Sequence, residues 1–248
     1  MDLSAAPFFW QQQQWRQMLG QFRADRLAHA TLVWGESGLG KTEFVSSFSA
    51  LMLCQQRAAE RACGSYKSCL LVKNNSHPDL QLLAPEAGSK EIKIDQVRAV
   101  TGFVNRTSHA GGAKIAIIDQ AHRLNNNSAN ALLKTLEEPT NHTYLFLITN
   151  LPGRLKPTIR SRCQRINLAL PSYDASKDWL QDQGVGSADA DMALARNGGA
   201  PVAAMNWLSS GVATVQEKWV SELQQWTTSS LPLDKIASSW SKLEFQTV

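Results

Sequence analysis

Residues 30–42, ATLVWGESGLGKT, decide the fold. The first five residues, ATLVW, form a short apolar run that is typical of a buried strand. The next eight, from Gly35 to Thr42, match the phosphate-binding pattern G-x-x-x-x-G-K-[ST]. Over residues 42–53, apolar side chains recur at helical spacing. A strand, a glycine-rich loop and a helix in this order open a parallel α/β fold.

The glycine-rich loop predicts a nucleotide site. Glycine lets backbone N–H groups curl around phosphates without a clash from a Cβ atom, and the candidates are Gly35, Gly38 and Gly40. Lys41 would reach the β- and γ-phosphates, and the Thr42 hydroxyl would ligate Mg²⁺. A tight glycine turn with a solvated lysine is the alternative, and the flanking strand and helix argue against it.

A second apolar strand, KIAII over residues 114–118, ends in Asp119, a carboxylate that can hold the magnesium shell. Gln120 follows where hydrolysing P-loop proteins usually carry a glutamate. An amide can orient water but cannot accept its proton, so the sequence predicts nucleotide binding with weak or absent hydrolysis. The alternative that Gln120 is only a surface residue at the end of a strand stays open. Thr149, directly after a third strand over residues 144–148, completes the expected nucleotide contacts.

The remaining pattern predicts a doubly wound sheet followed by helices. Strands are expected at 79–83 and 165–170, and helices at 8–22, 95–104 and 127–138. We expect a nucleotide-binding domain over 1–170 with a cysteine-containing insertion at 54–69. Short helices at 172–183, 188–196 and 201–208 predict a small helical domain over 171–208. The polar stretch 209–248 is expected to begin a further helical domain and to be truncated.

Composition narrows the class of protein. The chain has 248 residues, of which 43% are hydrophobic and 19% charged, which suits a globular protein and excludes a disordered one. There is no apolar run of about 20 residues, as a membrane-spanning helix would need, and the start lacks the pattern of a secretory signal. The net charge of +4 permits an anionic partner. We expect a cytoplasmic protein with no membrane partner.

Three of the four cysteines, Cys54, Cys63 and Cys69, crowd into one short stretch. In a cytosolic protein, such spacing points to a metal ion rather than to disulfides.

Four segments carry a resemblance to a known family. They are His29-Ala30, His77-Pro-Asp79, NALLKTLEEP over 130–139 and TIRSRC over 158–163. Their combination resembles the bacterial clamp-loader branch of the AAA+ ATPases, and the resemblance covers residues from about 8 to 208. The resemblance implies an AAA+ P-loop domain, a helical lid and the start of a helical collar. It also implies binding of ATP with Mg²⁺.

Within that branch the chain resembles the delta-prime type of DNA polymerase III subunit more than the gamma/tau motor. Gln120 replaces the motor's glutamate, Pro201 stands after Gly198-Gly-Ala where a sensor arginine is expected, and the helix 201–208 has no arginine. This resemblance implies that Arg162 is an arginine finger for a neighbouring motor subunit. The implied partners are gamma/tau and delta subunits, the sliding clamp and primed DNA. A gamma/tau-type motor and a stand-alone P-loop NTPase are the alternatives.

The resemblance also bears on the cysteines and on DNA. A four-cysteine zinc module of the family corresponds here to Cys54, Cys63, Tyr66 and Cys69, so a tyrosine stands at one ligand position. Structural zinc sites nearly always have four ligands. Two interpretations therefore stay open: the cysteines bind Zn²⁺, or they are three reduced cysteines that shape the loop. In the family, the side of the domain that corresponds to Lys93, Arg98 and Arg106 can face DNA phosphates; a solvated helix face explains these residues equally well.

Overall fold

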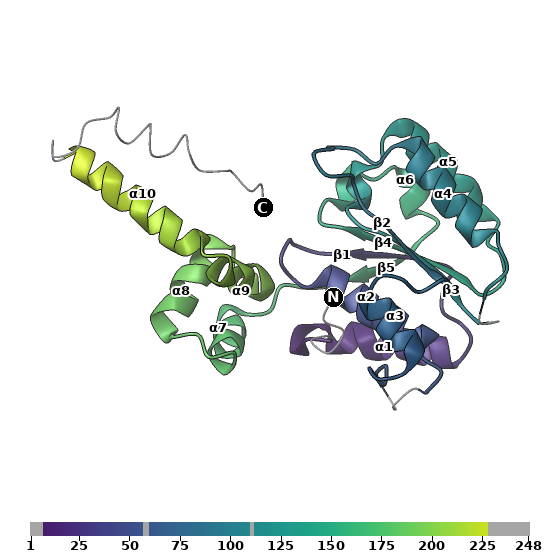
Figure 1. Ribbon diagram of the computed structural model, residues 1–248, viewed down its shortest axis with the longest axis horizontal. Helices are drawn as coiled ribbons and strands as arrows, with labels where there is room; N and C mark the ends of the chain where they lie inside the picture. Colours follow the sequence, from purple (N-terminus) through teal and green to yellow (C-terminus); the bar gives the residue numbers. More distant parts are fainter. Residues whose placement is uncertain (1–6, 57–59, 110–111, 228–248) are drawn as a thin grey trace. The chain divides into compact units, whose positions relative to one another are not determined.

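The computed structural model describes residues 7–56, 60–109 and 112–227 (Figure 1). The chain divides into two compact units, residues 1–175 and 176–248, and each is described by itself. The finer division into a lid over 171–208 and a collar from 209 stays a prediction.

Within the described residues, five parallel strands form the sheet of the first unit, in the order β2-β3-β4-β1-β5. The strands are β1 (Ala30–Trp34), β2 (Leu80–Leu83), β3 (Lys114–Ile118), β4 (Thr143–Thr149) and β5 (Gln164–Asn167). Every residue of β3 and β4 is buried, which explains why both read as continuous apolar runs rather than as alternating ones. The expected α/β class with a parallel sheet is confirmed.

Helices cover both faces of the sheet (Figure 1). One face carries α1 (Gln12–Arg23), which follows the 3₁₀ turn η1 (Phe9–Gln11), together with α2 (Lys41–Leu53) and the short α3 (Lys67–Lys73). The other carries α4 (Ile94–Val104), α5 (Asn126–Glu137) and α6 (Pro157–Arg160). Alternate strand residues serve the two faces: Leu145 and Leu147 join the α4–α5 core, whereas Phe146 joins the α1–α2 core.

Aromatic side chains anchor α2 to the sheet. The Phe48 ring lies 5.3 Å from that of Trp15 and 6.2 Å from that of Phe146, both in edge-to-face contact. All three side chains are at most 2% exposed. This packing holds in place the helix that follows the glycine-rich loop.

The second unit is helical in its described part. It contains most of α7 (Tyr173–Asp182) and all of α8 (Ser187–Arg196), α9 (Pro201–Ser209) and α10 (Val212–Thr227). A small core of short side chains joins α7, α8 and α9, among them Leu180, Ala190, Leu194 and Ala204. The Arg196 guanidinium lies 5.4 Å from the centre of the Trp207 ring, a cation–π distance.

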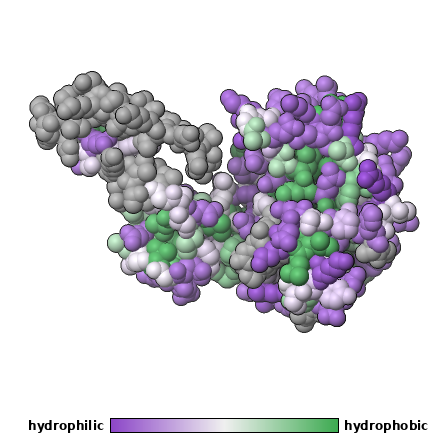
Figure 2. Space-filling model, in the orientation of Figure 1, coloured by the Kyte–Doolittle hydropathy of each residue, from purple (hydrophilic) through white to green (hydrophobic). Residues whose placement is uncertain are grey.

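One strand and two short helices differ from the sequence prediction. The last strand ends at Asn167 rather than at residue 170, because the Leu168 N–H makes a final bond to the Trp34 carbonyl (2.8 Å) and the chain then leaves the sheet. Helices α3 and α6 were not predicted; with seven and four residues they are too short to show a helical period. None of the helices in the described residues is long and apolar enough to cross a membrane. The α/β unit shows a mostly hydrophilic face with hydrophobic patches in Figure 2.

Candidate nucleotide-binding site

The carboxyl ends of three adjacent strands bring the predicted nucleotide residues together. The glycine-rich loop follows β1, Asp119 follows β3, and Thr149 ends β4, which lies between them. The connection after β1 goes to one face of the sheet and those after β3 and β4 to the other. Such a switch point is where open α/β sheets bind ligands.

The loop has a backbone shape that only glycine adopts readily. Gly38 and Gly40 have φ angles of 75° and 72°, in the left-handed region. Space is also restricted, since a Cβ atom on Gly35 would lie 2.3 Å from the Leu168 carbonyl oxygen and one on Gly40 2.5 Å from the Phe8 ring. Gly40 caps α2, so the free N–H groups of the first helical turn lie at the loop, where they favour an anion.

Lys41 is 9% exposed, and its ammonium group lies inside the loop, where it donates to the Glu36 carbonyl oxygen at 2.5 Å. Burial lowers the pKa of Lys41, against the opposing effect of the Asp119, Glu36 and Glu43 carboxylates. A buried ammonium is stabilised by an anion beside it. The position of Lys41 therefore fits a lysine whose ammonium group could leave the Glu36 carbonyl oxygen and donate to a phosphate oxygen instead.

Thr42 and Asp119 lie side by side, as a shared magnesium ion would require. The Thr42 hydroxyl donates to Asp119 Oδ2 at 3.4 Å, and the Gln120 N–H donates to Asp119 Oδ1 at 2.8 Å. Hydroxyl and carboxylate oxygens are ligands that Mg²⁺ prefers, so these residues fit that ion. Gln120 has a φ of 50°, which turns the chain sharply at the end of β3.

Thr149 belongs to a partly buried hydrogen-bond pair that the sequence did not predict. Its hydroxyl accepts the Leu151 N–H at 3.0 Å and lies 3.0 Å from Nδ1 of His122. Burial first, and then Arg123 and Arg154, lower the pKa of His122, so its ring is neutral near pH 7. The sequence signal that could have pointed to His122 is its position three residues after Asp119.

Arg162 lies away from these residues, in the turn between α6 and β5. Its guanidinium forms an ion pair with Glu137 at 2.6 Å and donates to the Thr158 carbonyl at 2.9 Å, and both charged side chains are exposed. Because β5 begins at Gln164 and runs parallel to β1, Arg162 lies at the amino ends of the strands.

The three cysteines of the insertion form a cluster. Cys63 Sγ lies 3.5 Å from Cys54 Sγ and 3.7 Å from Cys69 Sγ, and all three sulfurs are within 4.8 Å of one another. A tetrahedral zinc ion with bonds of about 2.3 Å needs sulfurs about 3.8 Å apart, so these three fit. The exposed Tyr66 contributes a backbone N–H to Cys63 Sγ at 3.4 Å.

The cluster's thiols differ in acidity. The backbone N–H of Tyr66 lowers the pKa of Cys63 to about 6, and burial raises the pKa of Cys69 to about 12. Of these two thiols, Cys63 is therefore the one that is prepared as a thiolate near pH 7.

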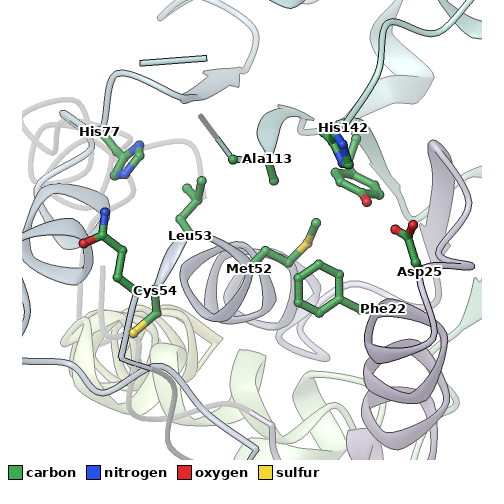
Figure 3. Close-up of a pocket in the computed structure, with 11 residues that line it drawn as sticks. Phe22, Asp25, Met52, Leu53, Cys54, His77, Ala113 and His142 are labelled. Carbon is green, nitrogen blue, oxygen red and sulfur yellow. The ribbon is translucent and has the colours of Figure 1, made fainter. Parts of the chain in front are cut away.

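A cavity of about 270 Å³ lies near this cluster, at the far end of α2 from the glycine-rich loop (Figure 3). Met52, Leu53 and Cys54 line it from α2 and its end, together with Phe22 and His142. None of the described lining residues belongs to the nucleotide site, so the cavity is a separate feature.

Comparison with known proteins places the chain in a family. Residues 10–172 match the family model described as DNA polymerase III, delta subunit. The chain is 39% identical over 238 residues to DNA polymerase III subunit delta' of Pseudomonas aeruginosa, covering 94% of this chain and 71% of that protein. It is 38% identical over 197 residues to the protein of the same name from Escherichia coli, covering 79% of this chain and 59% of the relative. A solved gamma subunit-related protein from Thermotoga maritima aligns with 83% of this chain and 66% of its own, at 22% identity and a TM-score of 0.48.

Proposed function

We propose that this chain, which belongs to the DNA polymerase III delta' subunit family, works as a stator in a clamp loader during DNA replication. It would join gamma/tau and delta subunits and help to place the sliding clamp on primed DNA. One arrangement carries the proposal: a complete phosphate loop without a catalytic glutamate lies at one end of the strands, and an exposed arginine lies at the other. Such a subunit would act in the cytoplasm, where chromosomal DNA is copied.

The nucleotide would be ATP with Mg²⁺. The N–H groups of the glycine-rich loop and the Lys41 ammonium would hold its phosphates, and Thr42 and Asp119 would hold the ion. Bound Mg²⁺ would neutralise phosphate charge. Gln120 can orient a water molecule but cannot accept its proton, so we expect this subunit to bind ATP and to turn it over slowly or not at all.

Arg162 would act on a neighbour's nucleotide. Thr31 of β1 is paired with Gln164 of β5, and Gly35 lies four residues further along the chain, directly after the end of β1. That separation is about 13 Å along the strands at about 3.3 Å per residue. Arg162 precedes Gln164 and therefore lies still further from its own loop. An exposed arginine in this place suits a finger for a different chain, a role worth about 10³–10⁵ in the rate of phosphoryl transfer in other NTPases.

A zinc ion would be held by Cys54, Cys63 and Cys69 with an exchangeable fourth ligand such as water. The sulfur spacing supports this set. The alternative, three reduced cysteines that shape the insertion, is tested below.

Contact with DNA would involve the exposed side of α4. Lys93 and Arg98 lie there, with Lys93 3.6 Å from Glu86 and Arg98 3.1 Å from Asp95. Exposed pairs of this kind are weak, so phosphates can replace the carboxylates.

A gamma/tau-type motor is the second candidate, and the intact loop favours it. ATPase activity of the reconstituted loader with clamp and primed DNA separates the two. We expect Arg162→Ala to lower this activity at least a hundredfold and Arg16→Ala, on the exposed side of α1, to leave it unchanged. Full activity in an assembled Arg162→Ala complex would contradict the stator proposal, and rapid hydrolysis by the isolated chain would establish the motor.

A further inference from the structure

Gln11 is a buried polar residue that the proposed function does not yet use. It is the first of four consecutive glutamines and is 0% exposed, whereas Gln12 and Gln13 are exposed. Burying a primary amide is costly unless its hydrogen bonds are made. A fully buried amide next to the glycine-rich loop therefore calls for a physical reason.

Both ends of the Gln11 amide are used, and the partners fix its orientation. Nε2 donates to the carbonyl oxygens of Leu39 (2.8 Å) and Gly40 (3.0 Å), and Oε1 accepts the Phe8 N–H (3.0 Å). Carbonyls only accept and a backbone N–H only donates, so the flipped amide would lose all three bonds. The indole N–H of Trp10 donates to the same Leu39 carbonyl at 3.1 Å.

These contacts help to set where the loop's N–H groups point, together with the Phe44 N–H of α2, which also donates to the Gly40 carbonyl (2.9 Å). In a trans peptide, the carbonyl of one residue and the N–H of the next lie in one plane and point in opposite directions. Holding the Leu39 and Gly40 carbonyls from the side of Gln11 therefore aims the N–H groups of Gly40 and Lys41 the other way. Those two N–H groups belong to the phosphate-binding pattern.

The Phe8 ring prevents the loop from relaxing toward Gln11. It lies so close to Gly40 that an added Cβ atom would be 2.5 Å from a ring carbon. The loop is thus held by hydrogen bonds to its carbonyl oxygens and by the Phe8 ring, which packs against Gly40.

We infer that Gln11 is a positioning residue of the phosphate loop, which orients the N–H groups of Gly40 and Lys41 toward a bound phosphate before any ligand arrives. The inference rests on the proposed ATP binding. Ordering a loop in advance lowers the cost of binding, so losing this orientation weakens affinity for the phosphates.

The test uses the whole chain and two ligands, MgATP and inorganic triphosphate, with dissociation constants from calorimetry. Gln11→Met keeps a side chain of similar length and removes the amide, and Gln13→Met is the matched control. We expect Gln11→Met to bind both ligands about tenfold more weakly, since one or two net hydrogen bonds are lost, and Gln13→Met to bind as the parent does. An equal loss for both ligands identifies the phosphate cradle as the part affected, which a general loss of packing would not do.

Unchanged affinity of Gln11→Met for both ligands would overturn the inference and leave ATP binding intact. A parent protein that binds neither ligand would overturn the proposed ATP binding and the inference with it. If Gln11→Met does not fold, Trp10→Phe removes one donor to the Leu39 carbonyl from a partly exposed side chain, and we expect a two- to threefold loss. Unchanged affinity there overturns the inference as well.

Discussion

The two ends of α2 differ in how their groups are held. The helix has 13 residues and is about 20 Å long, with the glycine-rich loop at its start and Cys54 directly after its end. At the start, left-handed glycines, the ends of three strands and a buried glutamine all hold the same backbone. At the end, three sulfurs meet through the local spacing of the insertion, with the exposed Tyr66 close by in the sequence.

This difference separates a site built by the fold from one built by local sequence. The glycine-rich loop depends on contacts from elements far apart in the chain, so its backbone shape is set by residues outside the loop. The cysteine cluster lies within 16 residues, and as the proposed zinc site it would depend on the number of thiol ligands, of which this stretch supplies three. A change in the core should therefore affect the first through stability, whereas a single substitution at Tyr66 should change the second directly.

The largest effect is expected from Phe48→Ala, in the middle of α2. Removing this fully buried ring should lower the free energy of unfolding by about 3–5 kcal/mol, because a cavity replaces its edge-to-face contacts with Trp15 and Phe146. Denaturant unfolding measures this loss. Phe9→Ala, which truncates an exposed ring, is the control; equal stabilities of the two variants would contradict the packing described for α2.

At the start of α2, Lys41→Ala should weaken MgATP binding about a hundredfold, since a charge-assisted contact to phosphate is lost. Lys73→Ala, at the exposed end of α3, should leave affinity unchanged. Calorimetric titration distinguishes them. Equal affinities of Lys41→Ala and the parent would exclude the proposed phosphate contact.

At the end of α2, Tyr66→Cys should raise zinc affinity at least tenfold by restoring the fourth thiolate. Competition with a chromophoric chelator gives the affinity, and metal analysis gives the stoichiometry. Tyr173→Cys, an exposed tyrosine elsewhere, is the control for adding a thiol. Absence of zinc from the parent after mild purification would favour three reduced cysteines, and a Tyr66→Cys variant that also lacks zinc would remove the site.

The smallest expected effect is a pH dependence of stability that comes from His77, near the end of α2. His77 is buried; its Nδ1 accepts the Asp79 N–H (3.0 Å), so the other nitrogen, Nε2, carries the proton and donates to the Ser68 hydroxyl (2.9 Å). That hydroxyl donates to the carbonyl of Leu53, the last residue of α2 (2.8 Å). Burial lowers the pKa of His77 below its ordinary value of about 6.5.

Below pH 6.5 the unfolded chain therefore binds a proton that the folded chain does not yet accept. Stability is full above that pH and should decrease as the pH falls through the folded-state pKa of His77. Thermal unfolding between pH 7.5 and 5 measures the slope, and His77→Gln should make it shallower. An unaltered slope in that variant would assign the pH dependence to other groups.

The strands and the phosphate loop could be predicted from sequence because their signals are local. Buried parallel strands are continuous apolar runs, and the loop has a fixed spacing of glycines before Lys41 and Thr42. The partners of these residues could not be predicted. Nothing in a run of four glutamines marks Gln11 as the buried one, since that depends on where η1 meets the loop. The ion pair of Arg162 and Glu137 joins two elements that only the folded sheet brings together.

The opposite placement of Arg162 and the glycine-rich loop has a consequence for symmetry. In a two-fold contact, a residue i of one partner meets a residue j of the other and the reverse, so an antiparallel pair of copies would bring each Arg162 to the other's loop and close the assembly at two subunits. The proposed role, in which Arg162 serves a different chain, instead requires a head-to-tail contact, which uses different surfaces on the two partners. Repeated head-to-tail contacts produce a ring or a helical filament. The proposed role of Arg162 therefore predicts an assembly in which all the contacts have the same direction.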